Sequence, residues 1–213
     1  ESPRIADLLA AVTDALGYVH RRGYLHRNLK PRKILIGHTG HPRLSGFDLA
    51  IEPNSHQSDG SVVGTPPYMA PELFTGADLG PFTDIWAMGV ILYQALCNEA
   101  PFGGDLEQTM QKIVENKPPP PPSSHEPSTP HGLEAIGMRC LAMAPADRYQ
   151  TAEQMGDDLR GWLSGTRASK AQERPPRVFI SHSSADREIV ERTIVEPLEQ
   201  NGIETWYSKA NIQ

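Results

Sequence analysis

The sequence predicts a mainly α-helical α+β domain over residues 1–163, followed by the first part of an α/β domain over residues 177–213. Two observations separate these parts. Through most of the first part, apolar residues recur at the spacing of helices that bury one face. The second part fits a strand, a helix and a strand in that order, which is the usual start of a parallel sheet.

Residues 2–22 fit an amphipathic helix that opens the first domain. Its apolar face is formed by Ile5, Leu8, Leu9, Val12, Leu16 and Val19. Pro3 lies in the expected first turn, where a proline removes no helical hydrogen bond. Gly23 follows the last apolar position, so we expect the helix to end there.

Two short strands and a loop are expected after this helix. Residues 34–36 and 42–44 flank the turn residues Gly37 to Gly40, a pattern that predicts a small hairpin. Residues 53–67 are polar and rich in Gly and Ser, so they are expected to form a loop.

Phe82 to Leu96 is a strongly apolar segment that predicts a buried helix. Thr83 or Asp84 is its expected N-cap, because both side chains can accept a hydrogen bond from a free backbone N–H. The apolar stretch is interrupted by Gly89 and is shorter than the roughly 20 residues that a bilayer requires. We therefore expect no membrane segment.

Pro118 to Pro122 is the most conspicuous low-complexity feature. Helical patterns resume at residues 133–141 and 152–163, so we interpret the prolines as a surface loop inside the first domain. A polyproline ligand for a recognition module is the alternative. Residues 164–176 are polar and contain two prolines, and they are expected to form a flexible linker between the domains.

Composition excludes several classes of function. The net charge is −6 and no run of Lys or Arg occurs, so binding to nucleic acid or to an anionic membrane is not expected. Cys97 and Cys140 lack metal-ligand spacing and are expected to be free thiols in a reducing cytosol. The chain has neither an initiator Met nor a signal peptide, so we expect a cytoplasmic protein and a fragment at both ends.

Five segments occur in the order that is typical of protein kinases. They are His26–Leu35, Gly46–Ala50, Gly64–Glu72, Asp84–Val90 and Asp147–Arg148. The first resembles the catalytic loop of that family, the second takes the place of Asp-Phe-Gly, and the third ends in Ala-Pro-Glu. The resemblance covers residues 1 to about 163 and implies the C-terminal lobe of a serine/threonine-type protein kinase, a family that uses ATP and Mg²⁺.

The positions that carry chemistry in this family are altered. Phosphoryl transfer needs a carboxylate that accepts the substrate proton, and oxygen ligands that hold Mg²⁺ against the phosphates. The resemblance places Asn28 at the base position, and Lys33 and Gly46 at the two metal-ligand positions. The nearest carboxylate, Asp48, is displaced by two residues, about 6 to 7 Å along an extended chain. We therefore expect no intact catalytic residue and no metal site.

Structural positions of the family pattern are kept. They are His26, Arg27, Phe47, Glu72, Asp84 and Arg148. In the family, the late arginine pairs with the glutamate of Ala-Pro-Glu, so Arg148 is expected to pair with Glu72. Lys30 matches a residue that contacts the transferred phosphate or the base. Thr65 matches a residue that helps to fix the peptide-substrate site, with a loop residue capped by its own backbone as the alternative.

Two expectations concern the cleft itself. Lys33 and Asp48 are hypothesised to pair across the former metal position, with a solvated lysine and an exposed aspartate as the alternative. No glycine-rich loop or strand lysine of the kinase type occurs upstream of the first motif. We therefore expect that these residues cannot enclose ATP, and no cofactor is expected in this chain.

Residues 178–186 resemble the first strand and loop of Toll/interleukin receptor (TIR) domains, which have a flavodoxin-like α/β fold. Ser181, Ser183 and Asp186 form the polar loop at the carboxyl end of that strand, where α/β domains bind ligands. A capped helix N-terminus is the alternative for the same residues. Some members of the family self-associate and others cleave NAD. The resemblance thus implies protein partners and TIR self-association, and leaves NAD open.

Three hypotheses follow from the two resemblances. The first is a catalytically inactive, kinase-like domain that relays a signal to a TIR-like effector or scaffold. The second is an active serine/threonine kinase with an atypical metal site. The third is a TIR-type, NAD-cleaving effector that a pseudokinase supports. Asn28, Lys33 and Gly46 favour the first over the second, because together they remove the base and the metal ligands.

Overall fold

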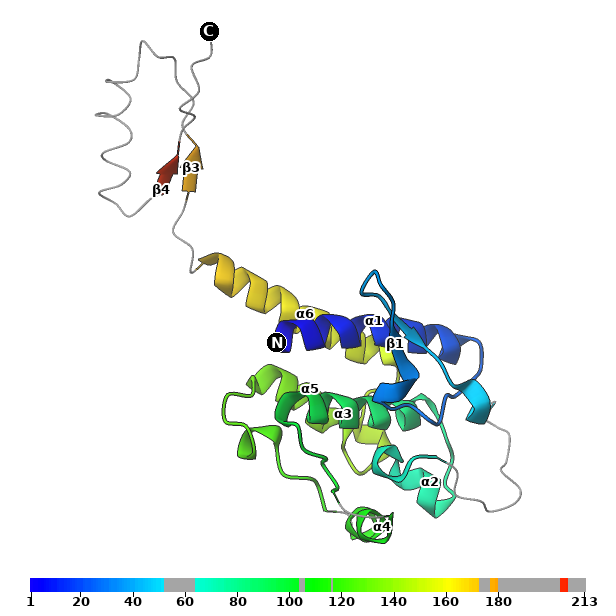
Figure 1. The fold of residues 1–213 in the computed structure, drawn as a ribbon. Coiled ribbons are helices and arrows are strands. Elements are labelled where there is room, and N and C mark those ends of the chain that lie inside the picture. Colours follow the sequence, from blue (N-terminus) through cyan, green and yellow to red (C-terminus); the bar gives the residue numbers. More distant parts are fainter. Residues whose placement is uncertain (52–63, 104–105, 116, 173–176, 180–203, 207–213) are drawn as a thin grey trace, which may run out of the picture. The chain divides into compact units, whose positions relative to one another are not determined.

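The computed structural model describes residues 1–51, 64–103, 106–115, 117–172, 177–179 and 204–206. The chain divides into two compact units, Glu1–Ser164 and Gly165–Gln213. The first unit is rich in helices, with one two-stranded sheet among its described residues (Figure 1). Its helices are α1 (Ser2–Arg21), α2 (Pro71–Thr75), α3 (Pro81–Cys97), α4 (Leu106–Val114), α5 (His131–Cys140) and α6 (Ala152–Gln172), the last of which continues into the second unit.

Helix α3 lies at the centre of the first unit, and most of its side chains are buried. Ile85, Met88 and Leu92 face a core that also contains apolar residues of α1, α5 and α6. On the other side of the helix, Trp86 belongs to a second core, where its ring stacks on Phe102 at 5.4 Å between centroids. The helix is buried on both sides because its sequence is apolar almost all round.

The start of α3 differs from the expectation. The helix begins at Pro81 with Gly80 as its N-cap, and the Gly80 N–H donates to Thr83 Oγ1 at 3.3 Å. The prediction of Thr83 or Asp84 as the N-cap is therefore wrong. Pro81 can open a helix because its missing N–H would have no helical partner at that position. Asp84 then lies inside the first turn, where its carboxylate is free for other partners.

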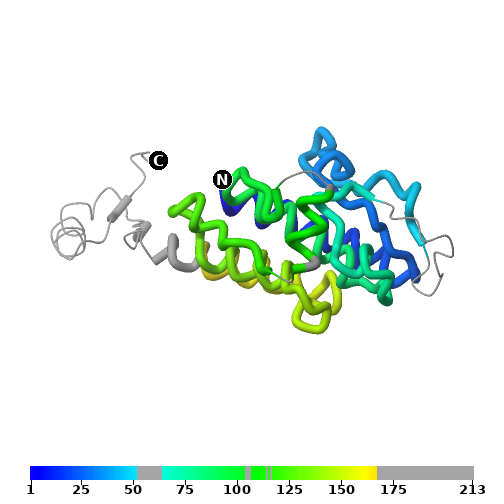
Figure 2. Tube along the Cα trace, turned by 90° about the horizontal axis from the view of Figure 1, so that it is seen from below, coloured from blue at the N-terminus to red at the C-terminus, as the bar shows by residue number. Residues whose placement is uncertain are grey.

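The predicted boundaries of the first helix are confirmed. Pro3 lies in the first turn of α1, and Gly23 follows the helix with a φ of +76°, a conformation that glycine adopts without strain. Strands β1 (Ile34–Ile36) and β2 (Pro42–Leu44) form the expected antiparallel hairpin. Strand β2 packs against α1. In Figure 2 the hairpin, in a lighter blue than α1, lies at the edge of the first unit.

The proline run belongs to the first unit. Pro119 and Pro122 are buried, and residues 118, 120 and 121 are exposed. Tyr93 Oη donates to the Pro120 carbonyl at 2.8 Å. Burial raises the pKa of Tyr93 to about 12, so the phenol keeps the proton that it donates. Pro119 and Pro122 are three residues apart, which is the repeat of a polyproline helix, and both are buried in the first unit. Their burial keeps them from contacting a recognition module, which supports the interpretation as a surface loop.

The second unit contains one pair of described strands. Strand β3 (Arg177–Phe179) pairs in parallel with β4 (Glu204–Trp206), with Val178 opposite Thr205. The parallel pairing agrees with the sequence prediction. The helix predicted over residues 186–200 lies outside the described residues.

Helix α6 is longer than expected. It runs to Gln172, so residues 165–172 are helical, although the composition predicted a flexible linker over residues 164–176. The helix can continue because this stretch contains Ala, Arg, Lys and Gln, which are strong helix formers, and no proline before Pro175. Within the described part of the chain, no helix has the length and apolar character needed to cross a membrane.

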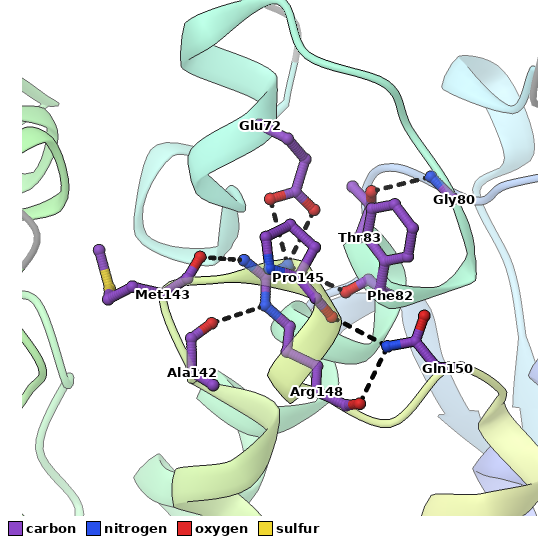
Figure 3. A network of polar contacts seen from close by, with 9 residues as sticks. All are labelled: Glu72, Gly80, Phe82, Thr83, Ala142, Met143, Pro145, Arg148 and Gln150. Atoms are coloured by element: carbon purple, nitrogen blue, oxygen red, sulfur yellow. Dashed lines mark hydrogen bonds and ion pairs between the residues drawn. The ribbon is translucent and has the colours of Figure 1, made fainter.

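A buried arginine joins three segments of the first unit (Figure 3). Arg148 Nη1 donates to both carboxylate oxygens of Glu72, at 2.8 and 3.1 Å, and to the Phe82 carbonyl at 3.3 Å. Its Nε and Nη2 donate to the carbonyls of Ala142 and Met143 at 2.7 and 3.0 Å. Arg148 therefore joins the start of α2, the start of α3 and the segment after α5. The predicted pairing of Arg148 with Glu72 is confirmed.

Arg148→Met is expected to lower the free energy of unfolding by about 3–5 kcal/mol, because it leaves the buried Glu72 carboxylate unpaired. The matched control is Arg160→Met. Arg160 forms exposed ion pairs with Asp14 and Asp157 and is expected to contribute no more than about 1 kcal/mol. Urea denaturation followed by circular dichroism measures both changes. Equal effects of the two substitutions would contradict a special role for Arg148.

Candidate functional site

A buried carboxylate on α3 holds the loop that carries the catalytic-loop motif. Asp84 Oδ2 accepts the N–H of His26 at 2.8 Å, and Asp84 Oδ1 accepts the N–H of Arg27 at 2.8 Å. His20 Nε2, near the end of α1, lies 2.9 Å from Asp84 Oδ2. The end of α1 and the loop that follows it therefore both meet α3 at one side chain.

Arg27 adopts an unusual backbone conformation within this loop. Its φ is +62°, which costs a residue other than glycine roughly 1–2 kcal/mol. The hydrogen bond from its N–H to Asp84 helps to offset that cost. Burial lowers the pKa of the Arg27 guanidinium, and the charge of Asp84 acts in the opposite direction.

His26 connects this loop to the segment after the hairpin. The N–H of Asn28 donates to His26 Nδ1 at 3.3 Å, so the ring proton lies on Nε2, which donates to the Ser45 carbonyl at 3.0 Å. The Phe47 ring packs on the His26 ring at 4.7 Å between centroids and is 42% exposed. The imidazole thus sets the position of residues 45–47 relative to the loop.

Asn28, Lys30 and Thr65 form one chain of hydrogen bonds. Lys30 Nζ donates to Thr65 Oγ1 at 2.7 Å, and Thr65 Oγ1 donates to Asn28 Oδ1 at 3.2 Å. The hydroxyl makes no capping bond to the 3₁₀ helix that follows, so the alternative of a self-capped loop residue is wrong for Thr65. The Asn28 amide accepts a hydrogen bond here, but it has no carboxylate with which to remove a proton.

Lys33 and Gly46 are neighbours because the Ser45 N–H donates to the Lys33 carbonyl at 2.9 Å. Gly46 has a φ of +78°, in the left-handed region that favours glycine. A Cβ at this position would overlap the Nζ and Cδ atoms of Lys33. The lysine side chain therefore fills the space into which any side chain at residue 46 would project.

The hypothesised ion pair beside Gly46 is confirmed. Lys33 Nζ lies 3.2 Å from Asp48 Oδ2. The side chain of Asp48 is 73% exposed and that of Lys33 is 23% exposed, so the pair lies at the surface of the first unit. The carboxylate that lies two residues after Gly46 is thus engaged by an ammonium group.

The structure leaves three predicted site residues unplaced. Ser181, Ser183 and Asp186 of the TIR-like loop lie outside the described residues. His20 and Ser45 also take part in the candidate site, and neither was predicted from the sequence. His20 had only its place near the end of an amphipathic helix as a signal, and Ser45 lies directly before Gly46 without a feature of its own.

The two cysteines differ in burial. Cys97 and Cys140 are free thiols, and Cys140 is fully buried. Burial raises the pKa of Cys140 well above its usual range, which makes this thiol unreactive. Over the described ranges, no three His, Cys, Asp or Glu side chains come together in a group that could hold a metal ion.

Comparison with known proteins agrees with this architecture. The family model of the protein kinase domain matches residues 1–159. The chain therefore belongs to the protein kinase family. Serine/threonine-protein kinase PknB of Mycobacterium tuberculosis is 32% identical over 161 residues, which are 73% of this chain and 26% of that protein.

Two other relatives match a similar share of the chain at a similar identity. PknB of Mycolicibacterium smegmatis is 34% identical over 161 residues, which are 73% of this chain and 26% of that protein. PknA of Mycobacterium tuberculosis is 32% identical over 174 residues, which are 80% of this chain and 39% of that protein. The chain thus spans about a quarter of the length of the PknB relatives and somewhat more of PknA.

Protein kinases use ATP and Mg²⁺, and the residues of this site do not fit the metal. Mg²⁺ needs oxygen ligands at about 2.0–2.1 Å. Lys33 offers only N–H donors, Gly46 has no side chain, and the Asp48 carboxylate binds Lys33 instead. An ammonium group would also repel a divalent cation placed beside it.

The contact between Lys33 and Gly46 can be tested through stability. Gly40→Ala, at a φ of +80° with open space around it, is expected to cost about 1–2 kcal/mol in free energy of unfolding. Gly46→Ala is expected to cost more, because Lys33 must also move away from Asp48. In a Lys33→Ala background this excess is expected to vanish.

Thermal or urea denaturation of the four variants gives the comparison. An excess cost of Gly46→Ala that survives in the Lys33→Ala background would show that Lys33 does not occupy this space. Gly40 serves as the matched control because its φ angle is nearly the same as that of Gly46.

Proposed function

We propose that the chain is a kinase-related signalling protein whose kinase domain does not transfer phosphate, coupled to a TIR-like effector or scaffold. The observation that carries the first part is the side chain of Lys33, which lies over Gly46 and binds Asp48. Of the two metal-ligand positions in the family pattern, one thus carries the ammonium group of Lys33, and the other, Gly46, has no side chain.

The loss of chemistry affects several requirements at once. Charge stabilisation by metal ions and positioned groups supplies most of the acceleration in phosphoryl transfer. Asn28 retains the hydrogen bond to Thr65 but cannot act as a base. Lys30 remains in place, and a phosphate contact without a base or a metal supports binding without turnover.

An active serine/threonine kinase with an atypical metal site is the second candidate. It is favoured by the relatives, whose names describe serine/threonine kinases. For Asp48 to ligate a metal ion, its carboxylate would have to leave Lys33 and approach the ion to about 2.0–2.1 Å. The exposed ion pair between Lys33 and Asp48 opposes the release of Asp48 only weakly. An experiment is therefore needed to separate the inactive from the active kinase.

Incubation with labelled ATP, Mg²⁺ or Mn²⁺ and generic protein substrates is expected to give no transfer above background. Asn28→Asp is expected to remain at background as well, because it restores the base position without the metal ligands. Metal-dependent incorporation that Lys30→Ala abolishes would establish the active kinase instead. Robust transfer by Asn28→Asp alone would contradict the account of the metal site.

The TIR-like part of the proposal concerns residues 177–213. It is supported by the resemblance of residues 178–186 to the first strand and loop of TIR domains, and by the parallel pairing of β3 with β4. The partners that we propose are proteins, including other copies of this chain through its TIR-like part. Cleavage of NAD by that part, with the kinase-like domain as its support, is the alternative output.

Deletion of residues 177–213 is expected to abolish self-association and any NAD consumption, while the kinase-like unit remains folded. Analytical ultracentrifugation and an NAD assay measure the two outputs. A variant with Gly/Ser at residues 165–175 is the control: it interrupts the last turns of α6 without removing either strand. Assembly or NAD consumption that persists after the deletion would assign the output to the kinase-like unit.

A further inference from the structure

The segment that contains the proline run turns one face to the first unit and two faces to solvent. A polyproline II helix has three residues per turn, so residues three apart share a face. Pro121 has the dihedral angles of this conformation, with a φ of −67° and a ψ of 147°. Pro119 and Pro122 form the buried face. The exposed residues come as two dipeptides, Lys117-Pro118 and Pro120-Pro121.

Two hydrogen bonds hold this segment on the first unit. Tyr93 Oη of α3 donates to the Pro120 carbonyl at 2.8 Å, and the tyrosine is fully buried. Directly after the run, the N–H of Ser123 donates to Glu134 Oε2 of α5 at 2.7 Å. The folded chain therefore presents the exposed dipeptides in an ordered conformation. A partner that binds them does not have to order a free proline-rich segment, which would cost conformational entropy.

We infer that the two exposed dipeptides bind a partner protein whose groove is lined by aromatic side chains and bordered by carboxylates. Grooves of this class recognise proline-rich segments in the polyproline II conformation. The two dipeptides are in register with the helix repeat, because Pro118 and Pro121 are three residues apart. Pro119, between the dipeptides, faces the core and leaves both of them open to the partner.

The carboxylates of the partner follow from the charge of Lys117. Its side chain is 73% exposed, and its Nζ lies 2.8 Å from a carboxylate oxygen of Glu115. An exposed ion pair of this kind is weak, so the ammonium group can turn to a carboxylate of the partner. The methylene groups of the lysine can then lie along an aromatic ring of the groove.

The inference goes beyond the proposed function, because it gives the kinase-like unit a protein partner of its own. The binding surface lies on residues 117–121 and uses neither the catalytic positions nor the TIR-like part. It is therefore independent of whether the kinase domain transfers phosphate.

Isothermal titration of the full chain with an array of purified SH3 and WW domains tests the inference, because both classes bind polyproline II segments. A synthetic peptide of residues 115–124 is titrated against the same domains. At least one domain is expected to bind the folded chain, and to bind it at least as tightly as the peptide, because the chain holds the segment in place.

Two variants assign the binding to this surface. Pro118→Ala combined with Pro121→Ala is expected to weaken the binding by about tenfold or more, with Pro127→Ala, at an exposed proline outside the run, as the control. Lys117→Glu is expected to weaken it several-fold by repelling the carboxylates of the groove. Arg32→Glu makes the same change of charge at another exposed residue and is expected to have no effect. Circular dichroism checks that each variant is folded.

The inference is overturned if no domain of the array binds the folded chain, or if the domains bind the peptide alone. The second result would show that the fold hides the segment from a groove. Equal binding by the unmodified chain and the double proline variant would also overturn it. If the double variant does not fold, Lys117→Glu decides, and unchanged binding by that variant overturns the inference.

Discussion

The buried carboxylate of Asp84 is the interaction on which the rest of the site depends. It accepts the N–H groups of His26 and Arg27, and it contacts His20 at the end of α1. Without this acceptor, two backbone donors would be buried without partners, and the strained conformation of Arg27 would lose its compensation. Because α3 is buried on both sides, the position of Asp84 is fixed by the core. The core thus determines where Asn28 and Lys30 lie.

In the proposed function, the scaffold of this domain is kept while its chemistry is lost. Arg148 and Glu72 remain fully buried and paired, and His26 still connects the loop to Ser45. These interactions stabilise the fold whether or not phosphate is transferred. Asn28 shows the difference at one position: its amide accepts a hydrogen bond from Thr65, but it has no carboxylate with which to accept a proton.

The side chain of Lys33 and the absence of one at Gly46 depend on each other. The lysine has room for its side chain because residue 46 has none, and glycine also suits the positive φ at that position. A carboxylate at residue 46 would have to displace Lys33 from its place. The ammonium group, held beside Asp48, is therefore part of the folded structure of the site. A lysine side chain that moved freely in solvent would not constrain its neighbour in this way.

The sequence by itself determined the elements and the family pattern. Pro3 and Gly23 marked the ends of α1 because such signals act on the adjacent backbone, and the order of the kinase motifs predicted the family. The tertiary structure alone decided how distant residues combine. Asp84 could be interpreted as a helix cap until the fold brought the loop of His26 to it, and α6 continued where composition predicted a linker. Lys33 and Asp48 became partners because Ser45 joins their segments. Local signals depend on neighbours along the chain, whereas these contacts depend on how the helices and the hairpin pack.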